Sequence, residues 1–196
     1  MSNRKTLLLI LLFAVISSCK KPSTTTNNCS GKNVEKEYFF SLKNYFCELM
    51  NTYNANNIKV NKRVSFGAKS ETIENLEIDW NAEFATFINA DINHSAWVDK
   101  FSIDTLKTND GFSVQYLSNT PSIPVKNVKV DFNKNEEVKA INIETSRSNA
   151  LYKSKQEIHF IPNEKYQVNG WQRTLFLSKT EFTVEGFILA DLDTNN

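Results

Sequence analysis

The chain has 196 residues, of which 23 are Lys or Arg and 22 are Asp or Glu, so its formal net charge is +1. This balance excludes the strongly basic surface that nucleic-acid-binding proteins use, and we expect no nucleic-acid partner. The chain is also rich in aromatic residues, with 14 Phe, six Tyr and three Trp, which favours a sheet-rich core.

The first segment of the chain has the order of a bacterial export signal. Arg4 and Lys5 precede an unbroken apolar run from Leu7 to Ile16, and this order predicts a signal peptide over residues 1–18. The apolar run is too short to cross a membrane, which takes about 20 residues. The Ile-Ser-Ser-Cys sequence that ends at Cys19 resembles the lipobox of bacterial lipoproteins. This resemblance implies cleavage before Cys19 and acylation of that residue; an ordinary secretory signal is the alternative.

A polar segment, residues 19–33, follows the predicted cleavage site and contains no large apolar side chain. It cannot bury enough surface to fold, so we expect a lipidated flexible tether that joins the membrane to a folded domain. In enterobacterial lipoproteins an Asp directly after the acylated Cys retains the protein in the inner membrane. By that resemblance, Lys20 favours the outer membrane, and we expect a lipid-anchored protein of the cell envelope that faces the periplasm.

Two further cysteines, Cys29 and Cys47, remain once Cys19 is assigned to the lipid. The envelope is a compartment in which disulfides persist, so the two cysteines can form a bond. The alternative is that Cys47 is a small buried residue and Cys29 an unpaired residue of the tether. The sequence leaves both alternatives open.

Two helices and a hairpin are predicted in the next part of the chain. Apolar residues at helical spacing, from Phe39 to Tyr53, predict an amphipathic helix. Alternation of apolar and polar residues over 58–66 and up to Ile78, around Gly67, predicts a β-hairpin. Asp79 is then a candidate N-cap for a second short helix that carries Trp80, Phe84, Phe87 and Ile88.

The rest of the chain reads as strands separated by short turns. We expect seven strands, over residues 100–107, 111–118, 124–133, 136–146, 151–161, 165–178 and 180–190. One face of these strands is apolar and the other carries Lys, Glu, Gln, Arg and Thr. This pattern is typical of an antiparallel sheet that helices cover on one side.

Together these elements predict a single α+β domain over residues 34–191, in which a strongly curved antiparallel sheet, a meander or half-barrel, packs on two helices. The order of the elements resembles that of the periplasmic lipoprotein carriers and their lipid-binding relatives. Short stretches such as Phe39-Phe-Ser-Leu-Lys-Asn-Tyr-Phe and Asp91-Ile-Asn-His-Ser-Ala-Trp are also similar to small uncharacterised bacterial lipoproteins, a resemblance that implies no activity.

Few residues are candidates for chemistry. Asp91, His94 and Trp97 lie close together where the second helix ends, and they form a weak candidate site; a capped and packed turn is the alternative. His159 is predicted to lie on the solvated side of a strand. No nucleophile, phosphate-loop or metal-binding motif occurs in the sequence. We therefore expect no catalytic residues, no metal and no cofactor, and a protein that is not an enzyme.

Two functions fit these observations. The first is a membrane-anchored lipoprotein with a non-catalytic binding domain for a lipid or another hydrophobic envelope ligand, which needs an apolar cavity between helices and sheet. The alternative is a structural or adaptor subunit of a cell-envelope protein assembly, which can have a filled core and use an exposed sheet face or edge strand.

Overall fold

The computed structural model describes residue 29 and residues 37–190. The predicted signal peptide, Cys19 and most of the predicted tether lie outside the described residues. Two α-helices, α2 (Leu42–Ala55) and α3 (Trp80–Ile88), and a short 3₁₀ helix, η1 (Ser95–Trp97), accompany the strands β1 (Lys59–Phe66), β2 (Lys69–Leu76), β3 (Phe101–Thr108), β4 (Gly111–Ser118), β5 (Val125–Asn133), β6 (Val138–Ser148), β7 (Tyr152–Ile161), β8 (Lys165–Thr174) and β9 (Thr180–Leu189).

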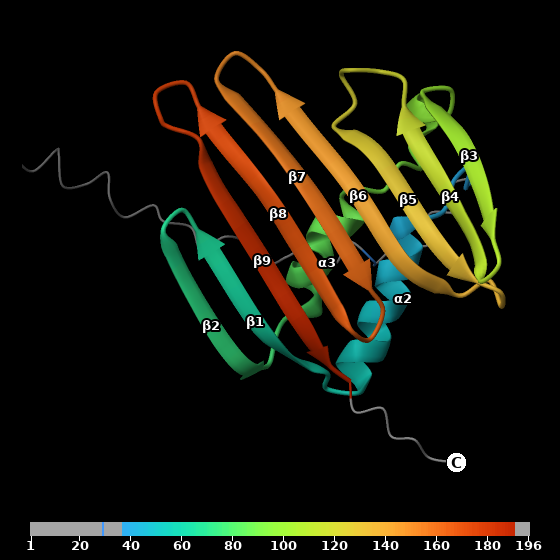
Figure 1. The fold of residues 1–196 in the computed structure, drawn as a ribbon, viewed down its shortest axis with the longest axis horizontal. Coiled ribbons are helices and arrows are strands. Elements are labelled where there is room, and N and C mark those ends of the chain that lie inside the picture. Colours follow the sequence, from blue (N-terminus) through green and yellow to red (C-terminus); the bar gives the residue numbers. More distant parts are fainter. Residues whose placement is uncertain (1–28, 30–36, 191–196) are drawn as a thin grey trace, which may run out of the picture.

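All nine strands form one antiparallel sheet in the order β2-β1-β9-β8-β7-β6-β5-β4-β3 (Figure 1). Strands β3 to β9 form the expected seven-strand meander, and the β1–β2 hairpin joins it beside β9. The sheet is open, with β2 and β3 at its edges. The predicted α+β class is therefore confirmed, with both predicted helices present.

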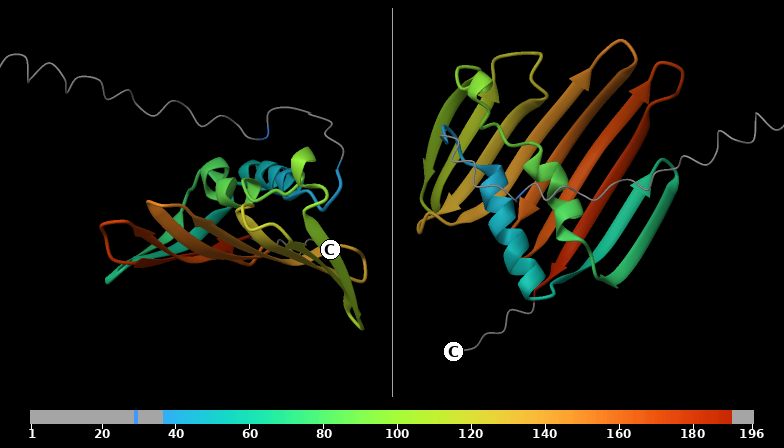
Figure 2. Two further views of the ribbon diagram at one scale, coloured as in Figure 1. Left: turned by 90° about the horizontal axis from the view of Figure 1, so that it is seen from above. Right: turned by 180° about the vertical axis from the view of Figure 1, so that it is seen from behind.

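The two helices lie on the same side of the sheet, as the two views of Figure 2 show. We call this side the covered face and the opposite side the uncovered face. Because side chains alternate along a strand, each strand contributes to both faces. Buried residues such as Ile141, Ile143, Ile158 and Phe160 define the covered face.

The N-terminal ends of both helices are capped by side chains. The Ser41 hydroxyl accepts a hydrogen bond from the Asn44 backbone at 3.1 Å, and Asp79 accepts one from the Asn81 backbone at 2.9 Å, as predicted for Asp79. The first helix begins at Leu42, so Phe39 precedes it. Phe39 is nevertheless buried, with its ring 5.7 Å from that of Phe101.

Aromatic rings fill the space between the helices and the sheet. The ring of Phe46 on α2 lies 5.1 Å from Phe84, 4.6 Å from Phe87 and 5.0 Å from Phe160 on β7. All four side chains are at most 1% exposed. These tilted and edge-to-face contacts are the geometries that aromatic pairs favour. The region where a lipid carrier needs a cavity is therefore packed.

Two glycines make room for aromatic rings between β8 and β9. Gly186 lies opposite Tyr166, and a Cβ atom at Gly186 would come within 2.1 Å of the tyrosine ring. Gly170 lies opposite Phe182 in the same way, and its Cβ would come within 2.6 Å of the phenylalanine ring. Each large ring therefore occupies space that its partner's missing side chain leaves.

The strand predictions hold within three residues, except at the end of β8. The sequence pattern predicts one strand over residues 165–178, which includes the apolar residues Leu175, Phe176 and Leu177. This extension is wrong: β8 ends at Thr174, and the three residues form a turn before β9 in which they are exposed. Apolar character alone does not distinguish a strand from an exposed turn.

A disulfide joins Cys29 to Cys47 on α2, with a Cα–Cα distance of 5.6 Å. Of the two alternatives that the sequence leaves open, the structure has the bonded one. The bond fixes Cys29 to the helix layer, at a point ten residues after the predicted acylation site.

Candidate functional site

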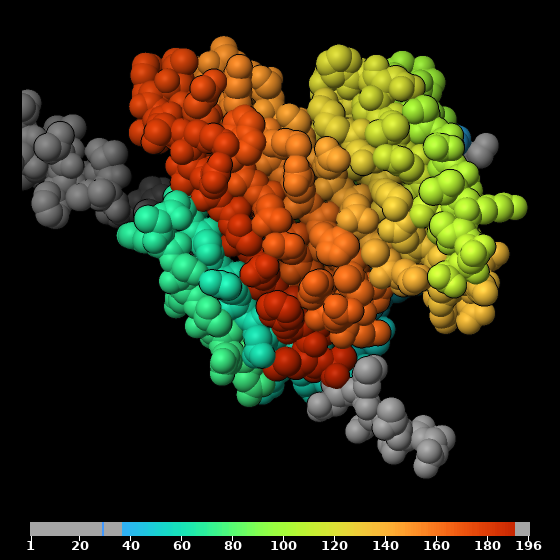
Figure 3. All heavy atoms as spheres, in the orientation of Figure 1, coloured from blue at the N-terminus to red at the C-terminus, as the bar shows by residue number. Residues whose placement is uncertain are grey.

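The uncovered face carries a continuous row of polar side chains across all nine strands. Strand pairing places one polar residue from each strand in this row, in the order Thr72, Arg63, Glu185, Gln167, His159, Asn142, Lys129, Gln115 and Asp104. Neighbouring members bond to each other: Gln167 donates to Glu185 at 2.9 Å, and His159 Nδ1 lies 2.6 Å from Asn142 Oδ1. Figure 3 shows this face as a broad surface formed mainly by the strands.

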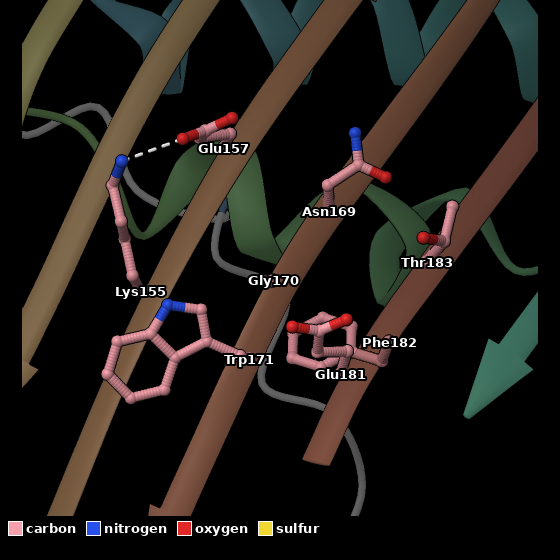
Figure 4. Close-up of a pocket in the computed structure, with 8 residues that line it drawn as sticks. All are labelled: Lys155, Glu157, Asn169, Gly170, Trp171, Glu181, Phe182 and Thr183. Carbon is pink, nitrogen blue, oxygen red and sulfur yellow. Dashed lines mark hydrogen bonds and ion pairs between the residues drawn. The ribbon is translucent and has the colours of Figure 1, made fainter. Parts of the chain in front are cut away.

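Next to this row, β7, β8 and β9 form an open pocket of about 420 Å³ (Figure 4). Trp171 forms one wall and lies directly opposite Lys155 of β7. Asn169 lies between Glu157 and Thr183, so an amide, a carboxylate and a hydroxyl stand side by side across three strands. Gly170 and Phe182 close the floor between them.

Ion pairs hold the charged groups around the pocket. Lys155 Nζ lies 2.7 Å from Glu157 Oε1, and this hydrogen bond raises the pKa of Lys155. Lys179 Nζ lies 2.7 Å from Glu181 and 5.3 Å from the centre of the Trp171 ring, and its hydrogen bond lowers the pKa of Glu181. Lys155 therefore stays cationic and Glu181 stays anionic at neutral pH.

This arrangement is suited to binding. The half-buried Trp171 indole offers an apolar surface with a polar N–H, and the amide, hydroxyl and charged groups around it offer both donors and acceptors. No His or Cys lines the pocket.

The three residues of the sequence-predicted candidate site follow α3, with Asp91 and His94 in the loop and Trp97 at the end of η1, and all three make contacts within the domain. The Asp91 carboxylate accepts hydrogen bonds from the backbone of Lys43 at 2.7 Å and of Asn93 at 2.8 Å, so it ties this loop to the first turn of α2. The exposed His94 ring packs against Trp97, with ring centres 4.3 Å apart. The contacts of Asp91 are those of a cap, which is the alternative that the sequence offers.

Asn93, between these residues, was missed by the sequence reasoning. Its side-chain oxygen accepts from the backbone N–H groups of Tyr38 and Phe39 at 2.9 and 3.0 Å, and its amide donates to Phe39 O at 3.3 Å. It thus holds the segment before α2 against the loop after α3. A partner more than 50 residues away leaves no local signal in a sequence.

His159 lies on the uncovered face, as expected from the strand pattern. Partial burial, and then the nearby positive charge of Lys165, lower the pKa of His159. The imidazole is therefore neutral at neutral pH, and its contact with Asn142 is structural.

Other hollows lie at the periphery of the domain. One of about 850 Å³ lies at the end of α2 and is lined by Asn57, by Asn75 of β2 and by Asn163. These asparagines have positive φ angles, 50°, 52° and 57°, which explains their residue type by backbone conformation. A smaller hollow of about 290 Å³ lies between Trp97, Arg147 and the end of α3.

The sequence predicted the polar side of the strands but not the pocket on it. Trp171 and Asn169 belong to the same strand and could be placed on one face by their spacing. Their partners Lys155 and Thr183 come from β7 and β9, and the sequence does not give the register that brings them together.

Comparisons with known proteins indicate no function for this chain, so its function has to be argued from the structure. No protein-family model, curated protein or solved structure matches the chain. None of the helices within the described residues is long and apolar enough to cross a membrane. In the same part of the chain, no group of three or more His, Cys, Asp or Glu side chains could hold a metal ion.

Proposed function

We propose that this chain is a lipid-anchored adaptor of the cell envelope that binds a partner protein on the uncovered face of its sheet. The observation that carries the proposal is the contrast between a fully packed helix layer and a broad uncovered face with a polar row and the Trp171 pocket. Protein interfaces favour such a composition, because an aromatic anchor among polar groups combines burial with hydrogen bonds.

The location in the envelope is part of the proposal. It is supported by the signal-like segment up to Ile16 and by the lipobox-like sequence at Cys19. The Cys29–Cys47 disulfide supports it further, because such bonds persist in oxidising compartments and are rare in the cytosol.

The other function considered, a carrier of lipid or another hydrophobic ligand, would require the sheet to curve around an internal cavity. The Phe46, Phe84, Phe87 and Phe160 rings occupy that region, so a ligand would have to displace them. The adaptor is therefore the function that the geometry supports best.

Site-specific photo-crosslinking in the native membrane tests the adaptor. A photoreactive residue replaces Asn169 in the pocket in one variant and the exposed Asn44 on α2 in a matched control. We expect a discrete crosslinked product from position 169 that Trp171→Ala abolishes, and no such product from position 44. Equal products from both positions, or none from position 169, would contradict the proposal.

A further inference from the structure

Four large apolar side chains project into solvent at one end of the sheet. Leu151 lies in the β6–β7 loop, and Leu175, Phe176 and Leu177 lie in the β8–β9 loop, with exposed fractions of 65%, 59%, 91% and 70%. The two loops are neighbours, since the Leu175 N–H donates to Leu151 O at 2.9 Å. Figure 2 shows both loops extending beyond the helices. We call these four residues the apolar tip.

Three cations lie beside the apolar tip, and Lys179 is the one that is paired, with Glu181. Lys153 and Arg173 lie directly opposite each other on β7 and β8, although like charges in this position repel each other. Among the described residues, neither forms an ion pair. The hollow of about 730 Å³ between the loops is lined by these two residues and Lys179, and by no carboxylate.

An apolar projection with a rim of cations matches one kind of surface. Apolar side chains enter the boundary between headgroups and acyl chains, while Lys and Arg bind anionic headgroups. Trp171 lies two residues from Arg173, at the level where indole rings collect in membrane proteins. A protein partner would have to place its own carboxylates opposite Lys153 and Arg173, whereas a layer of anionic headgroups supplies negative charge beside an apolar phase that the four exposed side chains can enter.

We infer that the apolar tip is a membrane-docking element that inserts into a bilayer containing anionic phospholipid. It is a second membrane contact, separate from the proposed lipid on Cys19. The ten residues from Cys19 to Cys29 span at most about 36 Å, so the tether holds the domain close enough for the tip to reach the bilayer. Docking through the tip would orient the strands, and with them the uncovered face, at a steep angle to the membrane plane.

Vesicle co-sedimentation tests this inference with a chain of residues 20–196, which retains every residue of the described core and lacks the acylation site. The vesicles contain phosphatidylethanolamine and phosphatidylglycerol at 70:30, or phosphatidylcholine alone. We expect binding to the anionic vesicles that weakens as salt rises, and much weaker binding to phosphatidylcholine.

Three variants locate the contact. Replacing Leu175, Phe176 and Leu177 by Ser is expected to weaken binding to the anionic vesicles at least tenfold. Lys153→Gln with Arg173→Gln is expected to remove the preference for anionic vesicles. The matched control, Ile103→Ser with Leu106→Ser, removes two exposed apolar side chains from the edge strand β3, away from the tip, and should bind like the unchanged chain.

A second measurement does not depend on the variants' affinity. An environment-sensitive dye on Phe176→Cys should shift to the blue when anionic vesicles are added. Absence of vesicle binding by the unchanged chain, equal binding by the Ser variant, or an unshifted dye would each overturn the inference. None of these results bears on the crosslink from Asn169, so the adaptor proposal and the docking inference can fail separately.

Discussion

The two faces of the sheet come from alternate residues of the same strands, yet they have opposite chemistry. On the covered face, Ile158 and Phe160 are at most 2% exposed, and the Phe160 ring packs against Phe46 of α2 and Phe84 of α3. On the uncovered face, His159 between them bonds to Asn142 and belongs to a polar row nine strands wide. One face therefore holds the fold together, while the other lies at the surface and is not needed for the core.

The largest expected effect tests this division directly. Phe160→Ala removes a ring that contacts Phe46, Phe84 and Phe87, and it should lower the free energy of unfolding by about 3–5 kcal/mol. His159→Ala, one residue away, should lower it by less than about 1 kcal/mol, since it removes one partly exposed contact. Urea unfolding under oxidising conditions measures both. Similar losses of unfolding free energy in the two variants would contradict the division of the sheet into a stabilising face and an uncovered face.

The disulfide comes next in size. Cys47→Ser opens a link between residues 18 apart and should lower the free energy of unfolding by about 2–4 kcal/mol. Reducing the unchanged protein should produce the same loss in urea unfolding. A loss on reduction in the Cys47→Ser variant as well would show that the effect is not due to this bond.

Alkaline pH should destabilise the covered side. Burial raises the pKa of Tyr53 from 10.0 to about 12, although its contact with the Asn163 backbone opposes the shift. The unfolded chain therefore loses the Tyr53 proton first, so the stability is complete below pH 10 and is lost as the pH rises toward 12. In Tyr53→Phe, the free energy of unfolding from urea titrations should depend less on pH between 10 and 12. The difference in slope should correspond to the release of about one proton. An unchanged dependence would show that Tyr53 does not contribute.

Asn93→Ala should have a smaller effect, about 1–3 kcal/mol, because it leaves the Tyr38 and Phe39 backbone groups without their side-chain partner. The exposed neighbour His94 provides the control, and His94→Ala should change stability by at most about 0.5 kcal/mol. Thermal unfolding of the two variants side by side measures the difference. A larger loss for His94 would reverse the roles given to these residues.

The smallest expected effect is a stabilisation. Lys153→Gln removes the repulsion with Arg173 directly opposite, and at low salt it should raise the free energy of unfolding by a few tenths of a kcal/mol. The gain should vanish at 1 M salt, where charges are screened within about 3 Å. A destabilised variant would mean that Lys153 has a structural role.

The sequence predicts the covered face better than the uncovered one for a physical reason. Burial imposes periodicity, so the helix from Trp80 to Ile88 and the strand from Gly111 to Ser118 could be located by pattern and caps. Binding imposes no such period on Trp171 and Lys155, which meet only through strand register. Sequence pattern fails in a similar way at Phe176, because an apolar residue in an exposed turn resembles one in a buried strand.

Oxidative footprinting of aromatic side chains tests the central claim most directly, by comparing the protein in its native membrane with the purified protein. We predict that Trp171 and Phe187, at the two ends of the uncovered face, are modified less in the membrane than in the purified protein. Trp97, on the helix side, should be modified equally in both preparations. Trp80 is buried and should stay unmodified in both. Equal modification of Phe187 and Trp171 in both preparations would contradict the uncovered face as the binding surface.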